Sequence, residues 1–535
     1  MKKALIGIVI FSSFLFVSCR KANDGPSWDT ELLAPIANAS LNLNNLLTNS
    51  VIQANPDSSL KLVYENNFYG LKMDTLFKIP DTTISQILAI PISGITFAPG
   101  TVIPVLSPNT NTTYQLPGVQ LRTVIVKSGK VSYSIQSTVK HTTDFHYSIP
   151  SATLNGQPFS INITVPAAVG SSPGIYNQIF DLSGYTIDLT GYAHNMVNTI
   201  TTSLNVNISN SGDSVLVNND QITISNKFYD IIPYYAKGYF GQNTFNIGPA
   251  LSNFDVFKNI VSGSLSLEDV NFNLKIENPI GLDARMYINN LSSLNSHTNH
   301  LVDLQNSIMN TPININRASE SNGYGTGTIY PTYANFPLTT TNSNIRPFVE
   351  NLPDKLSYSL QIITNPLGNV SGSNDFIFSD HLLKAQLNME IPLSLMANNL
   401  TLVDTLALNI SNKDNVQNVH SGTLTLFAEN GFPFNAGLQM YLLNDQHAIA
   451  DSIFGYANTI DQAPVNSSLR VTDKKLTKII IPVSESKMKL LYDTKHIALK
   501  VKFNTSAQPN YVKIYSDYTI DVKLVGDINY TVHLK

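Results

Sequence analysis

The stretch "VNFNLKIENP" (residues 270–279) decides the fold class of this 535-residue chain. Its apolar and polar residues alternate strictly up to Glu277, and the period of two is typical of a strand with one buried face. The Asn278-Pro279 pair that follows predicts a turn. The stretch therefore predicts a β-strand that ends in a sharp corner.

The same alternation recurs along the chain, for example over residues 385–393 and 497–503. Asn155-Gly156 and Asn430-Gly431 predict turns between such strands. One segment has helical spacing: Ile345, Phe348, Val349 and Leu352 lie between Asn344, a potential N-cap, and Pro353. The pattern predicts an all-β protein built from antiparallel β-sandwich-like modules.

Three Ser-Gly pairs, at residues 128, 262 and 421, each precede an alternating strand, and the segments around the second and third pairs also correspond. We interpret these as tandem duplication of one β module. The alternative is that strands with Asn-rich turns simply look alike. The predicted domains are a signal peptide (1–18), an N-terminal β region (19–123), module 1 (124–258), module 2 (259–417) and a C-terminal module (418–535).

Composition narrows the classes of partner. The chain holds 33 Lys and Arg against 37 Asp and Glu, with a formal net charge of −4 and no basic run, which argues against nucleic acid as a partner. Hydrophobic residues make up 43% of the chain, which is enough for substantial cores.

The N-terminus carries Lys2 and Lys3 before an apolar run that ends at Val17, too short to span a bilayer as a mature helix. This arrangement predicts a secretory signal peptide. The only cysteine of the chain, Cys19, follows it directly. One alternative is an ordinary signal peptide followed by a stray cysteine.

The sequence Phe16-Val17-Ser18-Cys19 resembles the lipobox of bacterial lipoproteins. That resemblance implies cleavage before Cys19, a diacylglycerol on its thiol, and an outer-membrane protein held by its lipid without a transmembrane helix. No acidic run that resembles a surface-export signal follows the cysteine, so the periplasmic face is favoured over the cell surface.

Two longer segments, "SWDTELLAPIANASLNLNNLL" from residue 27 and "YYAKGYFGQNTFNI" from residue 234, resemble uncharacterised cell-envelope lipoproteins of the Bacteroidota. "LSLEDVNFNLKIENPIGLDARM" (265–286) is similar to the LEA type 2 (WHy) β-sandwich, which implies a sandwich without implying a function. Four tripeptides are similar to the Asp-Ser/Thr-apolar sites that Bacteroidota O-glycosylate; they begin at Asp74, Asp213, Asp404 and Asp451.

Few residues carry catalytic or metal-binding patterns. His297, His300 and Asp303 have spacing that could surround a metal on a helix, but they lie in a Ser/Asn-rich segment that predicts a surface loop. Asp144 and His146 share a strand face, where we expect a hydrogen bond across that face. We expect no cofactor, no metal and no catalysis, because the chain lacks nucleophile elbows, phosphate loops and a full calcium-loop pattern.

The sequence therefore predicts a lipid-anchored envelope protein with a non-catalytic binding or scaffolding role. Its expected partners are the membrane, through the lipid, and envelope proteins or glycans. Three alternatives stay open: an accessory glycan-binding lipoprotein with an exposed aromatic row, a periplasmic carrier of lipids or hydrophobic ligands, and a hydrolase. The lone Trp28 is expected to pack the first strand against its module.

Overall fold

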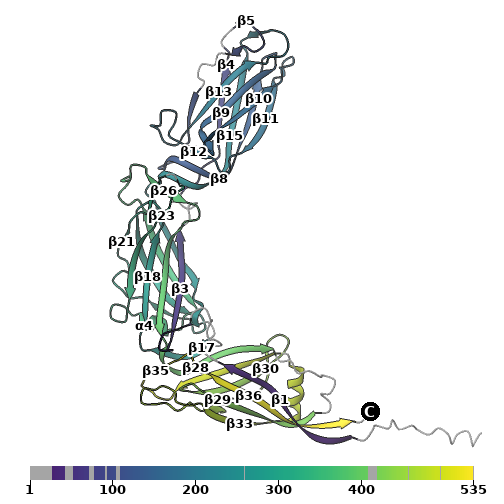
Figure 1. Ribbon diagram of the computed structural model, residues 1–535, viewed down its shortest axis with the longest axis vertical. Helices are drawn as coiled ribbons and strands as arrows, with labels where there is room; N and C mark the ends of the chain where they lie inside the picture. The colour runs from purple at the N-terminus through teal and green to yellow at the C-terminus, as the bar shows by residue number, and fades with distance from the viewer. Residues whose placement is uncertain are drawn as a thin grey trace, which may run out of the picture.

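The computed structural model describes residues 27–41, 52–71, 77–90, 93–103, 109–257, 260–323, 325–407, 419–455, 457–494 and 496–533. The chain is all-β and its sheets are antiparallel, which confirms the predicted fold class. Figure 1 shows three sandwiches, here called upper, middle and lower as oriented there. The upper and middle sandwiches form a column, and the lower one lies across its base.

The lower sandwich holds both ends of the described chain. One of its sheets has the order β1 (Ser27–Leu41), β36 (Ile520–His533), β29 (Val419–Asn430) and β33 (Lys475–Val483). The other has the order β17 (Ile260–Leu267), β28 (Ser394–Ala407), β34 (His496–Thr505), β30 (Phe434–Leu443) and β31 (Ile449–Phe454), with β32 (Thr459–Ile460) on β30 and β35 (Val512–Lys513) on β28. Helix α5 (Glu485–Asp493), capped by Ser484, precedes β34.

The middle sandwich pairs two five-stranded sheets. The first has the order β2 (Ile52–Ala54), β3 (Leu60–Leu71), β27 (Leu383–Pro392), β18 (Asn271–Asn278) and β24 (Thr332–Leu338). The second has the order β16 (Thr244–Asn253), β25 (Lys355–Thr364), β19 (Ala284–Asn295) and β20 (His300–Asp303), with β21 (Ile313–Ile315) on β19. The hairpin β22 (Ser319–Glu320) and β23 (Ile329–Tyr330) and the 3-10 turn η2 (Asp255–Phe257) also belong to this part of the chain.

The upper sandwich is one continuous sheet of eleven strands wrapped into two layers. Its main path is β26 (Asp375–Phe378), β15 (Gln221–Tyr239), β8 (Gln120–Ser137), β12 (Thr186–Asp188), β9 (Thr143–Leu154), β13 (Thr199–Ile208) and β6 (Val102–Ile103). Strands β4 (Thr82–Ala89), β7 (Asn109–Thr113), β10 (Gln157–Val165) and β11 (Gly174–Asp181) join this path from the side. A separate pair, β5 (Ser93–Phe97) and β14 (Val215–Asn218), lies at the far tip (Figure 1).

All three sandwiches repeat one order of strands. In each, the first strand of the repeat pairs with a later neighbour and with the last strand: β8 with β11 and β15, β18 with β24 and β27, and β29 with β33 and β36. The second strand pairs with a hairpin partner and with a later strand: β9 with β10 and β13, β19 with β20 and β25, and β30 with β31 and β34.

The N-terminal region differs from the separate β region expected over residues 19–123. Its strands β1, β3 and β4 instead pair in turn with the last strands of the lower, middle and upper sandwiches. The strand pairing also departs from the expected 124–258 and 259–417 segments, because β16 pairs with β25 of the second segment and β28 pairs with β34 of the C-terminal segment. The physical reason is that a sheet edge with unpaired N–H and C=O groups gains hydrogen bonds from any strand that reaches it, whatever its position in the sequence.

Each predicted Ser-Gly pair lies where a strand comes unusually close to its partner. A Cβ atom added to Gly263 would lie 2.1 Å from the carbonyl oxygen of Asn399, and one on Gly422 would lie 2.6 Å from that of Asp527. At Gly129 the close atom is Cδ1 of Ile231, at 2.5 Å. Register shifts interrupt all three strands beside these pairs, so the Ser-Gly signal marks β-bulges.

The predicted corners at Asn278 and Asn430 share one geometry. The side chain of Asn430 accepts the N–H of Phe432 at 2.8 Å and donates to the carbonyl oxygens of Phe434 and Asp461, both at 2.9 Å. Asn278 makes the equivalent bonds two and four residues ahead. Both side chains are fully buried, so each corner depends on a single amide.

A single hydrophobic cluster runs through all three sandwiches. Where the middle and lower sandwiches meet, three backbone segments bond in a closed ring: Leu60 N–H to Ile514, Ile514 N–H to Leu393, and Leu393 N–H to Leu60, at 2.8–2.9 Å. Continuous packing and this ring connect the column to its base.

The structure also describes the predicted helix after Asn344 and the side chain of Trp28. The helix expected after Asn344 is confirmed as α4 (Ile345–Glu350), with its apolar side chains buried. The prediction that Trp28 packs the first strand against its module is wrong, because this side chain is 48% exposed on the edge strand β1. An edge strand is covered on one side only, and alternation alone does not reveal which strands lie at an edge.

Candidate functional site

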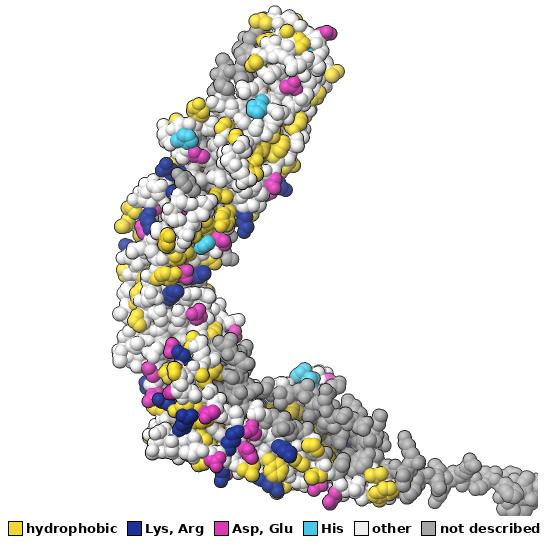
Figure 2. All heavy atoms as spheres, in the orientation of Figure 1, with side chains coloured by type: hydrophobic (Ala, Val, Ile, Leu, Met, Phe, Trp, Pro, Cys, Tyr) yellow, Lys and Arg dark blue, Asp and Glu magenta, His cyan; other side chains and the backbone are white. Residues whose placement is uncertain are grey.

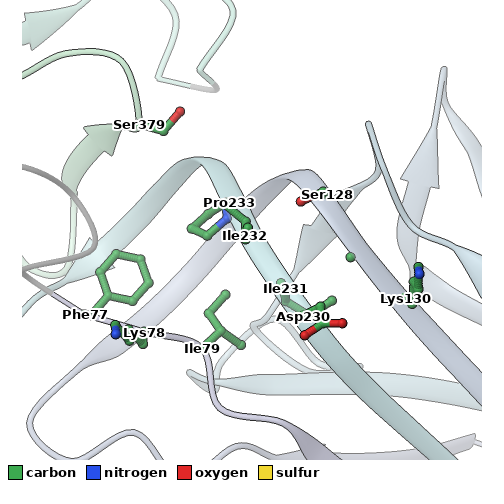
Figure 3. Close-up of a pocket in the computed structure, with 11 residues that line it drawn as sticks. Phe77, Lys78, Ile79, Ser128, Lys130, Asp230, Ile231, Ile232, Pro233 and Ser379 are labelled. Atoms are coloured by element: carbon green, nitrogen blue, oxygen red, sulfur yellow. The ribbon is translucent and has the colours of Figure 1, made fainter.

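A mainly apolar pocket lies where the upper sandwich joins the middle one. It has a volume of about 710 Å³. Figure 3 shows its lining: the segment Phe77–Ile79 on one side, strands β8 and β15 on the other, and Ser379, which follows β26.

The pocket exists because β8 and β15 bulge against each other. Their register shifts three times between Tyr229 and Tyr235. Asp230 adopts a left-handed backbone conformation, with φ 53°. Pro233 has no N–H to offer a neighbour, which suits a bulge. The two strands therefore part locally and leave a hollow that ordinary pairing would close.

The walls are mainly apolar. Phe77 packs on Phe240 with ring centroids 5.2 Å apart, and Ile232 keeps 54% of its surface exposed at the mouth. Charge is limited to Lys78, Lys130 and Asp230. Few polar groups in a mainly apolar hollow are typical of sites for small apolar or amphipathic molecules.

Where β26 meets the middle sandwich, charged groups fasten Asp375 of this strand to residues of that sandwich. Arg317 bonds Asp283 at 2.6 Å and Asp375 at 3.0 Å, and Asn365 donates to the second oxygen of Asp375 at 2.8 Å. Burial raises the pKa of Asp375, although hydrogen bonds from Ser371 and Asn365 and the charge of Arg317 oppose the shift. Every carboxylate here is engaged with the arginine, so the cluster is built for structure.

A small hydrophobic cluster lies beside these charges. It consists of Tyr235, Ala318, Phe376 and Phe378. The hydroxyl of Tyr235 donates to Glu320 at 2.9 Å, and burial together with this carboxylate raises the pKa of the phenol. Strand β15 pairs with β8 and with β26, and β26 in turn accepts the N–H of Gly281 of the middle sandwich through the carbonyl oxygen of Phe376, so these strands join the two sandwiches.

The histidines singled out from the sequence serve local structure. His300 lies in the β19–β20 hairpin, where its Nδ1 is 2.7 Å from Asn351, and Asp303 accepts the hydroxyl of Ser292 at 2.6 Å. The N–H of His297 donates to Asn295. In the part of the chain that the structure describes, no group of three His, Cys, Asp or Glu residues could hold a metal.

Asp144 and His146 do not bond each other, contrary to expectation. Each bonds the residue opposite it on β10: Asp144 accepts from Thr164 at 2.7 Å, and His146 lies 2.8 Å from Asn162. Residues two apart on a strand are separated by nearly 7 Å, whereas opposite residues lie about 5 Å apart. Each side chain therefore bonds the residue opposite it on the neighbouring strand and not the residue two positions away on its own strand.

The predicted lipid-attachment residue Cys19 lies outside the described residues, and so does Thr75 of the first Asp-Ser/Thr-apolar tripeptide. The other three tripeptides lie on described residues. Ser214 and Thr405 are exposed, while Ser452 is half-buried. Over the described ranges, no helix is long and apolar enough to span a membrane.

An exposed aromatic row at one module's tip was the mark expected of a glycan binder. Among the described residues, the exposed aromatic side chains are instead spread over all three sandwiches: Trp28, Tyr192, Tyr234, Tyr330 and Tyr333. The described tip β5–β14 holds none of them.

Sequence reasoning did not identify the pocket. Ser128-Gly129 was singled out only as a repeat marker, and Pro233 within an alternating run was the second available sign of a bulge. Together they mark the two strands that part.

No family model and no curated protein matches this chain. Among solved structures it is similar to "a putative secreted protein from Parabacteroides distasonis", at 10% identity over 93% of this chain and 99% of that one, with a TM-score of 0.27. It is also similar to infectious bursal disease virus, Gt strain, at 10% identity over 91% and 85% of the chains, with a TM-score of 0.11.

Proposed function

We propose that this protein is a lipid-anchored protein of the cell envelope, attached through Cys19 to the outer membrane, with a non-catalytic binding role. The periplasmic face is the favoured side, and envelope proteins or glycans, not nucleic acid, are the partners. The proposal is supported mainly by the position of Ser27, the first described residue, in the lower sandwich at one end of the molecule. Strand β1 begins in the lower sandwich, while the upper sandwich lies at the opposite end of the molecule (Figure 1).

That placement suits a molecule tethered at one end. Cys19 precedes Ser27 by eight residues, which span at most about 27 Å when extended. A lipid on Cys19 would hold the lower sandwich at the membrane and leave the column free to meet partners. The fold supplies reach and rigidity, which is what binding or scaffolding requires.

A second candidate, a carrier of lipids or other hydrophobic ligands, is favoured by the pocket alone. Its apolar walls and two lysines suit an amphipathic molecule with an acidic group. The two candidates are compatible, because the pocket lies on the column, away from the tethered end.

Fractionation of cells that express the native chain or Cys19→Ser tests the anchor. Release of the variant into the soluble fraction, with the native chain retained on membranes, supports the proposal; retention of both contradicts it. Protease treatment of intact cells then separates the periplasmic face from the cell surface.

Binding of a fluorescent fatty acid tests the carrier alternative. Ile232→Glu should abolish binding, because it places a charge in the apolar mouth of the pocket. Ile179→Glu, at a residue 60% exposed on β11 of the same sandwich, is the matched control. Equal binding by both variants would contradict a ligand in this pocket.

A further inference from the structure

The outer face of the β1–β36–β29–β33 sheet carries an apolar surface that the proposed anchor does not by itself explain. Residues directly opposite each other on neighbouring strands point to the same side of a sheet. The register therefore places side chains of this outer face in rows across four strands. One row contains Pro35, Val525, Thr425 and Ile480.

The rows beside it add further apolar side chains among polar and charged ones. Phe427 lies in the next row between Lys523 and Lys478, and the row beyond ends at Leu476. On the other side, Leu33 begins a row that ends at Pro482. Leu33, Ile480 and Leu476 are 72%, 59% and 55% exposed.

This outer face, here called the sole, has charges of both signs. Its lysines are Lys478 and Lys523, and its acids include Asp521, Glu429 and Asp527. The ammonium of Lys478 lies 5.7 Å from the ring centroid of Phe427. Lysine stems can cover apolar surface while their charges stay in water. The mixture gives no strong attraction to an anionic partner, so contact must come from the apolar rows.

The position of the sole fits the bend of the molecule. Figure 1 shows β29, β33 and β36 on the side of the lower sandwich that faces away from the column, and β17 and β28 on the side toward it. Figure 2 shows hydrophobic side chains among charged ones along this lower side. A flat surface in contact with the sole would therefore leave the column standing away from it.

We propose that the sole rests on the lipid surface of the membrane that holds the anchor, so that the lower sandwich is a foot and the column stands upright. The inference rests on the proposed function for the identity of that membrane. β1 is itself the edge strand of the sole, and its start lies within about 27 Å of Cys19 along the chain. A tether this short keeps the sole at high local concentration beside the bilayer, where even a weak apolar contact is populated.

A label on the sole tests this arrangement. The native chain and an Ile480→Cys variant are purified with their lipid and inserted into phosphatidylcholine vesicles that contain nitroxide-labelled lipid; the new thiol carries an environment-sensitive fluorophore. Leu251→Cys, at a residue 58% exposed on β16 of the column, is the matched control. We expect several-fold quenching at position 480, little at position 251, and little change with salt.

A second tether separates failure of the sole from failure of the anchor. The Cys19→Ser chain, with a His tag in place of the signal peptide, is held on nickel-chelating lipids and carries the same two labels in turn. Quenching at 480 on this tether supports the sole even if Cys19 proves not to be lipidated. Equal quenching at 480 and 251 on both tethers would overturn the proposal, and so would concentration-dependent shielding of position 480 without lipid, which would indicate a second copy of the chain.

Discussion

Replacement of Asn430 by alanine should be among the most damaging single changes in the lower sandwich. The side chain is fully buried and satisfies three backbone groups: the N–H of Phe432 and the carbonyl oxygens of Phe434 and Asp461. Alanine fills none of these roles. The corner between β29 and β30, which carries the chain from one sheet to the other, would then hold three unpaired polar groups.

The size of the effect follows from those three bonds. A buried backbone group left without a partner costs roughly 1–3 kcal/mol. Because the corner would relax in part, we expect the loss of three partners to lower the free energy of unfolding by about 3–5 kcal/mol. The equivalent change Asn278→Ala should cost a similar amount in the middle sandwich, because its amide makes the same three kinds of bond.

Urea unfolding with amide hydrogen exchange measures the change locally. Asn430→Ala should lower the midpoint of the first transition and remove protection from the Phe432 amide, which Asn430 now binds directly. Asn529→Ala, at an exposed position on β36 of the same sandwich, is the control and should change stability by less than about 0.5 kcal/mol. A cost below about 1 kcal/mol for Asn430→Ala would refute the reasoning, since at least one of the three groups would have found another partner.

Three further outcomes are expected. Gly263→Ala should lower the melting temperature, because φ is +94° there and the new Cβ would lie 2.1 Å from the carbonyl oxygen of Asn399; an unchanged melting temperature would contradict the close approach. Asp521 forms a partly exposed ion pair with Lys474. Asp521→Asn should therefore lower the free energy of unfolding by less than about 1 kcal/mol near neutral pH. Hydrogen bonds from Lys474 and Ser40 lower the pKa of Asp521, so the carboxylate stabilises the fold above pH 3.8 and loses this effect as the pH falls through the lowered pKa. The urea midpoints of the native and variant chains should therefore converge in acid. A difference that stays constant with pH would contradict this. Deletion of residues 20–41 should leave the edge of β36 unpaired and promote association, measured by light scattering; a monodisperse product would count against the edge role of β1.

Local features of the fold were predictable because they depend on neighbours in the sequence. Alternation over 270–277 specifies one buried face, and the spacing of Ile345 to Leu352 specifies a helix. The turn at Asn155-Gly156 is formed by two residues with positive φ, as such a pair favours. The Ser-Gly pairs were recognised, but their meaning as bulges needed the partner strand.

The functional surfaces were harder to predict because each combines distant segments. The pocket requires Phe77, Ser128, Ile232 and Ser379, which belong to separate strands and loops. The sole needs the register of four strands, and a slip of one residue would exchange its rows with the core. Alternation names the residues that face outward on one strand, but it says nothing about which strand lies beside it.

The order of the strands has a consequence for how the protein is divided. The chain first runs the length of the molecule as β1, β3 and β4, then returns through the upper, middle and lower sandwiches in turn. Only the upper sandwich takes nearly all its strands from one continuous segment, residues 82–239, whereas the middle one needs β3 and the lower one needs β1 and β17. A deletion in the first stretch therefore removes a strand that pairs with the last strand of one of the three sandwiches, far along the chain. Strand β1 is also the described strand nearest to Cys19 in the sequence. A load applied through the proposed lipid anchor would therefore reach β1 first, and this edge strand of the sole pairs with β36 along its whole length.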